Sequence, residues 1–173
     1  MGLLTVDVLE ALPVRIEDFP SDGMFYPIVK AVKDAFLEYP LLPTDDGSFM
    51  TSKHVKLASA KWLRNLLKGK QLKELLQSTS AVQWISGEIT ENRTKDLWSY
   101  LKEFLEIEEI TPDRFGRKID KSFLEIQSNE WMMAFYSYLN DQPNLWKEMA
   151  ITPEARGGYV CRPGPLRYKP FIR

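Results

Sequence analysis

The chain has 173 residues, with 23 Lys or Arg, 24 Asp or Glu and one His, and its net charge is −1. With 44% hydrophobic and 12% aromatic residues, it can bury about 70% of the surface that the unfolded chain exposes, which excludes a disordered protein. A single His and a single Cys exclude a His/Cys metal site, a disulfide and a Cys-x-x-Cys redox pair within one chain.

The sequence also lacks the features of a membrane protein or a secreted protein. No apolar run reaches the roughly 18 to 20 residues that a membrane helix needs, and the start has no basic n-region of a signal peptide. The near-zero net charge removes a whole-chain electrostatic argument for binding nucleic acid or an anionic membrane, so only local patches remain. We therefore expect a cytoplasmic protein.

The first third of the chain predicts two helices followed by a hairpin. Apolar residues recur at helical spacing over residues 3–12 and again over residues 23–38. The period then changes, and the Asp45-Asp46-Gly47-Ser48 turn between short apolar segments predicts a β-hairpin. Val55, Leu57 and Ala58 are expected to add a third short strand.

Helices dominate the rest of the chain. Ser59 is expected to cap a helix that ends near Gly69, a short helix follows over residues 71–77, and Thr94 is expected to cap a helix over residues 95–107. Residues 81–87 fit either a helix or a buried loop.

Four further positions carry the signals of a helix start. The two phrases Thr111-Pro112-Asp113 and Thr152-Pro153-Glu154 each combine a capping hydroxyl, Pro in the first turn and an acid. Asp120 and Ser128 are each expected to cap one more helix, the second of which has a stripe of large apolar residues on one face.

These elements predict an α+β, predominantly helical fold. We expect about seven helices with a small antiparallel hairpin or a three-stranded sheet near residues 41–58. A helical pattern begins directly after Gly2 without an N-cap residue, and an alternating, strand-like run over residues 166–172 ends the sequence. Both features are typical of a segment taken from a longer protein, which is what we expect here. Residues 1–155 would form its single domain, and residues 156–173 an extended basic arm.

A basic stretch is the most prominent local feature, because seven cations and no acid lie between residues 53 and 73. It could follow a phosphate backbone with one aromatic side chain for stacking, or it could be a solvated surface balanced by acids such as Glu103, Glu106, Glu108 and Glu109. The candidate residues are Lys53, Lys56, Lys61, Trp62, Arg64, Lys68, Lys70 and Lys73. A second basic set, in the arm, is a candidate docking segment and consists of Arg156, Tyr159, Arg162, Arg167, Tyr168 and Lys169.

Catalytic chemistry has weaker support in the sequence. His54 and Cys161 each lack an orienting partner nearby, and no glycine-rich nucleotide motif is present. Asp45, Asp46 and Glu130 could serve a metal-dependent hydrolase or nuclease only if they converged in one cleft. We therefore expect no catalytic, cofactor or metal site in this segment.

Three phrases resemble one group of proteins, and they read LEALP at residues 9–13 with FYP at 25–27, PLLPTDDG at 40–47, and QSNEW at 127–131 leading into FY at 135–136. The set resembles the region downstream of the ATPase domain in large bacterial sacsin-like proteins. These belong to the ATPase superfamily of gyrase, the ninety-kilodalton heat-shock chaperone, histidine kinases and mismatch-repair proteins.

This resemblance implies a chaperone-like ATPase whose nucleotide site lies in another domain. The family's Asn-bearing magnesium helix and Asp-x-Gly-x-Gly adenine motif are absent from this sequence. The expected function is therefore a non-catalytic middle or interaction region, whose partners are other domains of the same polypeptide or a client protein. The nucleic-acid-binding module and the hydrolase remain the two alternatives.

Overall fold

Helices make up most of the chain, and short strands join them. The computed structural model describes residues 5–12, 26–141, 151–153 and 159–161. Eight α-helices fall within these ranges, together with one antiparallel pair near residues 41–58 and a three-stranded sheet. The expected α+β, mostly helical fold is confirmed.

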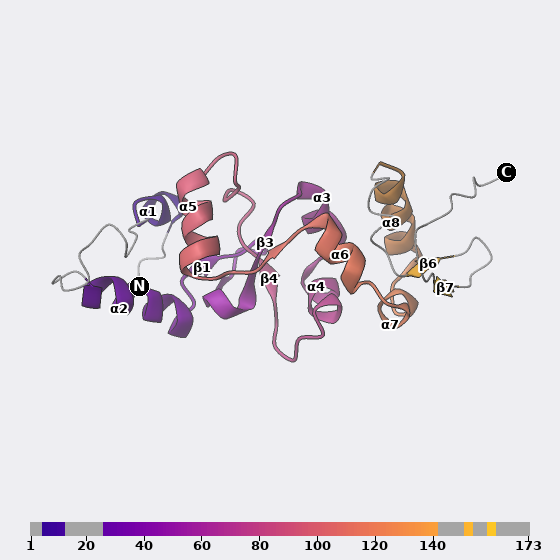
Figure 1. The fold of residues 1–173 in the computed structure, drawn as a ribbon, viewed down its shortest axis with the longest axis horizontal. Coiled ribbons are helices and arrows are strands. Elements are labelled where there is room, and N and C mark those ends of the chain that lie inside the picture. The colour runs from indigo at the N-terminus through magenta and orange to yellow at the C-terminus, as the bar shows by residue number, and fades with distance from the viewer. Residues whose placement is uncertain (1–4, 13–25, 142–150, 154–158, 162–173) are drawn as a thin grey trace.

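Figure 1 shows an elongated arrangement with α1 and α2 near one end and α7 and α8 near the other. In chain order the elements are α1 (Val6–Glu10), α2 (Tyr26–Glu38), β1 (Leu42–Pro43), β2 (Phe49–Met50), the 3-10 helix η2 (Ser52–His54), β3 (Val55–Ala58), α3 (Lys61–Leu66), α4 (Gly69–Leu75), β4 (Gln83–Trp84), α5 (Lys95–Ser99), the π-helix η3 (Tyr100–Phe104), β5 (Glu109–Ile110), α6 (Pro112–Lys118), α7 (Lys121–Glu125), α8 (Asn129–Asp141), β6 (Ile151–Pro153) and β7 (Tyr159–Cys161).

The predicted hairpin is present. β1 and β2 pair antiparallel, with Leu42 opposite Met50. The turn between them places Gly47 at φ +79°, a conformation that glycine adopts without steric cost. The Asp46 carboxylate stabilises the turn, because it accepts hydrogen bonds from the Thr44 hydroxyl at 2.6 Å and from the Ser48 backbone N–H at 3.0 Å.

The third predicted strand exists, but it belongs to a different sheet. β3 is the central strand of a parallel sheet in the order β4-β3-β5, with Val55 opposite Gln83 and Leu57 opposite Glu109. The hairpin joins this sheet beside β4, where the backbone N–H of Asp45 donates to the Trp84 carbonyl at 3.1 Å. The flanking strands have two residues each, too few to show an alternating pattern in the sequence.

Two hydrophobic cores lie on the two faces of this parallel sheet. Successive residues of a strand point to opposite faces, so Val55 and Leu57 join one core while Ala58 joins the other. The first core also includes Leu9 of α1, Phe36 of α2 and side chains of α5 and η3. The second includes Trp84 and side chains of α3, α4, α6, α7 and α8. The sheet therefore connects the two ends of the molecule.

Three of the predicted helix caps are confirmed. Thr111 accepts a hydrogen bond from the backbone N–H of Arg114 at 3.3 Å, and Asp120 accepts one from Phe123 at 2.7 Å. Ser128 accepts one from Trp131 at 3.2 Å. Each bond satisfies a backbone donor that has no partner within its own helix.

Four other helix predictions need correction. Ser59 does not cap α3, whose N-cap is Ala60, because the Ser59 hydroxyl donates to the Ile110 carbonyl at 3.4 Å instead. Gly69 begins α4 and does not end α3. Thr94 precedes α5, but its hydroxyl bonds the Thr90 carbonyl at 3.1 Å. The helix that it precedes is α-helical only to Ser99 and then widens into η3.

The predicted helix start at Thr152 is wrong. Residues Ile151–Pro153 form β6, which pairs antiparallel with β7 and places Thr152 opposite Val160. The local signals of a helix start are overridden by this strand pairing. The two strands lie on either side of the predicted boundary at residue 155, and most of the predicted arm lies outside the described residues.

Candidate functional site

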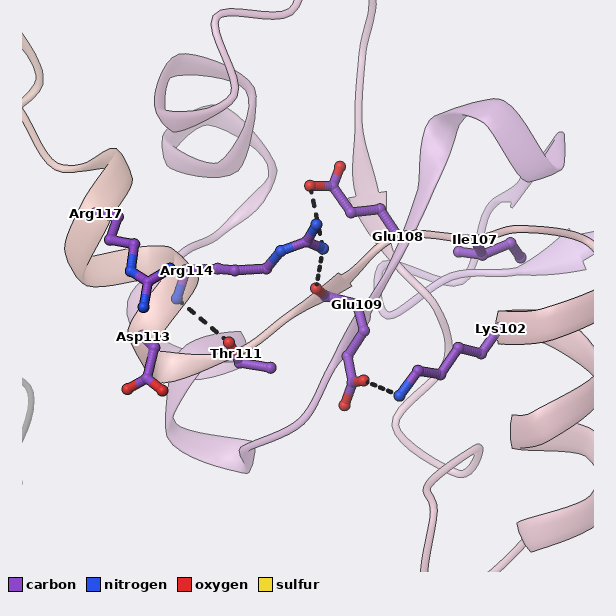
Figure 2. Close-up of a pocket in the computed structure, with 8 residues that line it drawn as sticks. All are labelled: Lys102, Ile107, Glu108, Glu109, Thr111, Asp113, Arg114 and Arg117. Atoms are coloured by element: carbon purple, nitrogen blue, oxygen red, sulfur yellow. Dashed lines mark hydrogen bonds and ion pairs between the residues drawn. The ribbon is translucent and has the colours of Figure 1, made fainter. Parts of the chain in front are cut away.

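An open hollow of about 470 Å³ lies beside β5. Figure 2 shows its lining, which comes from the π-helix η3, the segment leading into β5, and from β5 and α6 with the residue that joins them. The lining residues are Lys102, Ile107, Glu108, Glu109, Thr111, Asp113, Arg114 and Arg117. Three of them are cationic and three are acidic, so the hollow contains both charges in equal number.

The hollow lies against a strand edge that has no neighbouring strand in the described part of the chain. β5 is the last strand in the order β4-β3-β5. The backbone N–H of Leu57 donates to the Glu108 carbonyl at 3.0 Å, and that of Ser59 to the Ile110 carbonyl at 3.3 Å. Backbone groups alternate in direction along a strand, so the N–H and C=O of Glu109 face away from β3.

A side chain covers the outward carbonyl of this edge. Arg114 donates from its Nη1 to the Glu109 carbonyl oxygen at 2.9 Å, as Figure 2 shows. The same nitrogen lies 3.5 Å from Glu108 Oε1, and Lys56 Nζ lies 3.3 Å from the other oxygen of that carboxylate. Glu108 therefore shares its charge between two cations from different elements.

On the other side of the hollow, Lys102 and Glu109 form a short ion pair. Lys102 Nζ lies 2.6 Å from Glu109 Oε2. Its hydrogen bond with Glu109, and then the charge of that carboxylate, raise the pKa of Lys102 above its usual value. This pair connects η3 to β5 across a loop and fixes one wall of the hollow.

The charges of the hollow are largely paired with one another. Glu108 and Glu109 each form an ion pair with a neighbouring cation, which leaves neither of these two carboxylates free to act as a general base. Across the described residues, no three His, Cys, Asp or Glu side chains come together in a way that could hold a metal ion. A ligand in this hollow would contact the β5 backbone and the ion-paired side chains.

The structure distributes the basic stretch among different roles. Lys53, Lys61 and Lys68 are exposed and form no ion pair with another described residue. Lys56 pairs with Glu108, and Lys70 lies 3.9 Å from Glu74. Lys73 is half-buried on α4. The stretch is thus not one continuous cationic surface.

Trp62 is half-buried and packs against the second core. Its ring stacks on Tyr138 with the centroids 5.4 Å apart and meets Phe115 edge-on at 5.9 Å. These contacts join α3 to α8 and α6 within the second core. These contacts use part of the ring for packing, and the stacking role of Trp62 on a base stays a prediction.

Arg64 is buried and makes contacts within the fold. Its side chain is 9% exposed and donates to the carbonyls of Ile85 and Ile89, at 2.5 and 3.2 Å, while Nη1 lies 3.2 Å from Asp45 Oδ1. Burial lowers the pKa of Arg64 and the nearby Asp45 charge opposes this. The guanidinium group therefore holds α3, the hairpin turn and the loop after β4 together.

The carboxylates proposed for a hydrolase do not converge. Asp45 faces Arg64, and Asp46 accepts the hydrogen bonds of its own turn. Glu130 is exposed in the first turn of α8, and Figure 1 shows this helix well away from the hairpin. His54 Nδ1 lies 3.0 Å from the Thr51 hydroxyl, which is a local contact within a turn.

Sequence reasoning missed the hollow. The sequence indicates Glu108 and Glu109 only as balancing charges, and no pattern in it marks Lys102 or Arg114. Glu109–Ile110 directly precedes the Thr-Pro-Asp helix start, and a strand followed at once by a capped helix is the signal that could have located this edge. Of the proposed docking segment, Tyr159 begins β7, and the other members lie outside the described residues.

Comparison of the chain with protein-family models, with curated proteins and with solved structures found no match. In the described ranges, no helix combines the length and the apolar character needed to cross a bilayer.

Proposed function

We propose that this chain is a non-catalytic interaction region of a larger, cytoplasmic, chaperone-like ATPase. The observation that carries the proposal is the position of the exposed, large apolar side chains. Val8, Tyr26, Ile28 and Tyr39 are 43 to 57% exposed at the α1 and α2 end, and Ile126 and Met133 are 58 and 67% exposed at the α7 and α8 end. Burying such side chains against a partner would remove their apolar surface from water, which favours association.

The charged groups support the same function. Arg64, Asp45, Asp46 and Glu108 are all used in contacts that hold elements together. Figure 1 shows an elongated body, and exposed apolar side chains lie on the elements at both of its ends. This arrangement suits a segment that contacts one neighbour at each end. Those neighbours would be other domains of the same polypeptide or a client protein.

The proposal is tested first on the gene. The reading frame that contains this chain should encode an ATPase domain, and the purified chain alone should not turn over ATP. A reading frame without an ATPase, or steady ATP hydrolysis by the isolated chain, would overturn the proposal.

The two ends are then tested by substitution. Ile28→Glu and Met133→Glu should each weaken binding of the chain to the ATPase part of its polypeptide by about tenfold, since a charge replaces a buried apolar contact. Asp34→Lys on α2 and Ala134→Glu on α8 are controls, because both positions are exposed on the same helices and are not three or four residues from Ile28 or Met133, so each lies on another face. Titration calorimetry measures the affinities. Equal losses in the controls and in the end variants would count against the two ends as interaction sites.

A further inference from the structure

We propose that this molecule opens in two steps, in which the elements around the first core open while the second core keeps the parallel sheet folded. Arg64 is the side chain that couples the first step to the rest of the fold. The inference concerns how the chain moves and does not rest on the proposed function. Proteins commonly open in cooperative units smaller than the whole, each with its own free energy of opening.

The helices fall into two groups that do not share a core. Among the described residues, no α-helix contributes buried side chains to both cores. The helices α1, α2 and α5 pack in the first core, and α3, α4, α6, α7 and α8 pack in the second. Figure 1 shows the two groups toward opposite ends of the molecule, with β3 and β4 between them. Burial of apolar surface therefore holds the helices together within each group.

The parallel sheet is the boundary between the two groups. Within residues 26–141 the chain passes from one core to the other at residues 57–58 in β3, at residues 84–85 at the end of β4, and at residues 107–110 around β5. The flanking strands of this sheet have two residues each. The backbone pairing that connects the two cores is thus short.

The second core is the more strongly packed of the two. Phe135 lies between Phe115 and Trp131, with ring centroids 5.9 and 5.1 Å away. Aromatic pairs of this kind stabilise a core beyond the burial of their area. In the first core the described ring contact joins Tyr100 to Phe104, with centroids 4.9 Å apart. We therefore expect the first core to open at the lower free energy, while the sheet stays on the second.

Arg64 joins the two groups through buried hydrogen bonds. It lies on α3, a helix of the second core, and donates to the carbonyls of Ile85 and Ile89, which belong to the first core. Its side chain is 9% exposed. Opening of the first core would break these bonds, so they oppose that opening. The ion pair that joins η3 to β5 is half-exposed on its lysine side and contributes less.

Hydrogen exchange of the native chain in increasing, sub-denaturing urea measures both openings. The amides of Trp98 and Leu105, in α5 and after η3, report on the first opening. The amides of Leu57, Leu67 and Ile119, in β3 and at the ends of α3 and α6, report on the second. We expect the first pair to exchange at a lower free energy and with a smaller dependence on urea, because less surface becomes exposed. A single exchange isotherm for all five amides would overturn the proposal.

Trp131→Phe separates the two openings. The hydrogen bond that it removes, to the Leu66 carbonyl at 2.7 Å, lies within the second core and remains intact during the first opening. The variant should speed exchange at Leu67 and Ile119 by about fivefold or more and leave the amides of α5 and η3 unchanged. Equal acceleration of both groups would show a single cooperative unit and would contradict the two steps.

Arg64→Met tests the coupling. The bonds of Arg64 are already lost in the first opening, so their removal should speed exchange in both groups by the same factor, about fivefold or more. Lys61→Met, an exposed cation on the same helix, is the control and should change neither group. Acceleration of the second group alone would show that Arg64 does not couple the two cores. Arg64→Lys keeps one donor and should give a smaller, equal acceleration, which tests the same point even if Arg64→Met does not fold.

Discussion

The indole N–H of Trp131 donates a hydrogen bond to the carbonyl oxygen of Leu66 at 2.7 Å. Trp84 makes the equivalent bond to the neighbouring carbonyl, that of Leu67. Carbonyls in the last turn of a helix have no partner within that helix. Two tryptophans from α8 and β4 thus satisfy the C-terminal end of α3, which fixes this helix against both neighbours.

Trp131→Phe tests this relationship. The substitution keeps most of the ring packing but leaves the buried Leu66 carbonyl without a donor, so we expect the free energy of unfolding to fall by about 1 to 3 kcal/mol. Urea unfolding followed by circular dichroism measures the change. Met133→Leu, at an exposed position of the same helix, should change stability by less than about 0.5 kcal/mol. A loss in Trp131→Phe as small as in this control would show that the hydrogen bond contributes nothing.

Arg64→Met should destabilise the fold strongly. It leaves the Ile85 and Ile89 carbonyls without their donor, and each buried acceptor left without a partner costs about 1 to 3 kcal/mol. Asp45 also loses its cation, but its side chain is 33% exposed, so water solvates the carboxylate. Thermal and urea unfolding measure this loss. Lys61→Met, an exposed cation on the same helix, is the control and should stay within about 0.5 kcal/mol of wild type.

Because Arg64 is buried and the lysines near it are exposed, the nucleic-acid hypothesis is best tested on the lysines alone. A charge reversal that includes Arg64 would unfold the protein and imitate a loss of binding. The informative variant reverses Lys53, Lys61 and Lys68, which are exposed. If the chain binds nucleic acid through these residues, the affinity should fall steeply with salt and the triple variant should reduce that slope.

Asp120 should contribute to stability at neutral pH and not in acid. Its hydrogen bond from Ser122, and that from the Phe123 backbone, lower the pKa of the carboxyl group. The contribution is therefore present above the unfolded pKa of about 4 and disappears as the pH falls through the lower folded value. Asp120→Ala should cost about 1 kcal/mol at pH 7, and its difference from wild type should shrink in acid.

Asp120→Asn provides the control for this pH dependence. Asn caps helices about as well as Asp does but carries no titrating group. Its stability relative to wild type should therefore improve as the pH is lowered from 5 to 2, as measured by urea unfolding at each pH. A constant difference between the two proteins would contradict a lowered pKa at this position.

Tyr100 should make the fold sensitive to alkali. Burial raises the pKa of its phenol to about 12. The stability that depends on the neutral phenol is complete below the unfolded pKa of about 10 and is lost as the pH rises through the folded value. The free energy of unfolding should fall more between pH 9 and 11 in wild type than in Tyr100→Phe. Identical slopes in the two proteins would count against this assignment.

The helix caps and the hairpin could be predicted because their signals lie within a few residues of one another. Thr111, Asp120 and Ser128 each bond a backbone N–H three residues later. The β1–β2 turn likewise depends on Asp46 and Gly47, which are neighbours in sequence. Such local chemistry is readable from the sequence alone.

Features that depend on distant partners could not be predicted. β4 and β5 are strands only because β3 lies between them, and β6 is a strand because β7 pairs with it. Arg64 belongs by sequence to a basic stretch, yet its role is set by the Asp45 carboxylate and by the Ile85 and Ile89 carbonyls, at least 19 residues away in the chain. The hollow was missed for the same reason.

The π-helix η3 makes its helix tolerate a deletion better than an insertion. The Leu105 N–H bonds the Tyr100 carbonyl five residues earlier, at 3.1 Å, so this turn contains one residue more than an α-helical turn. Removing that residue would convert the turn to an α-helical one and keep the register of the residues that follow. Inserting one more residue would instead rotate everything that follows by about 100° around the helix axis, and Glu109 would move away from Lys102. Related sequences should therefore lose a residue here more often than they gain one, while the buried positions of Tyr100 and Leu101 keep large apolar side chains.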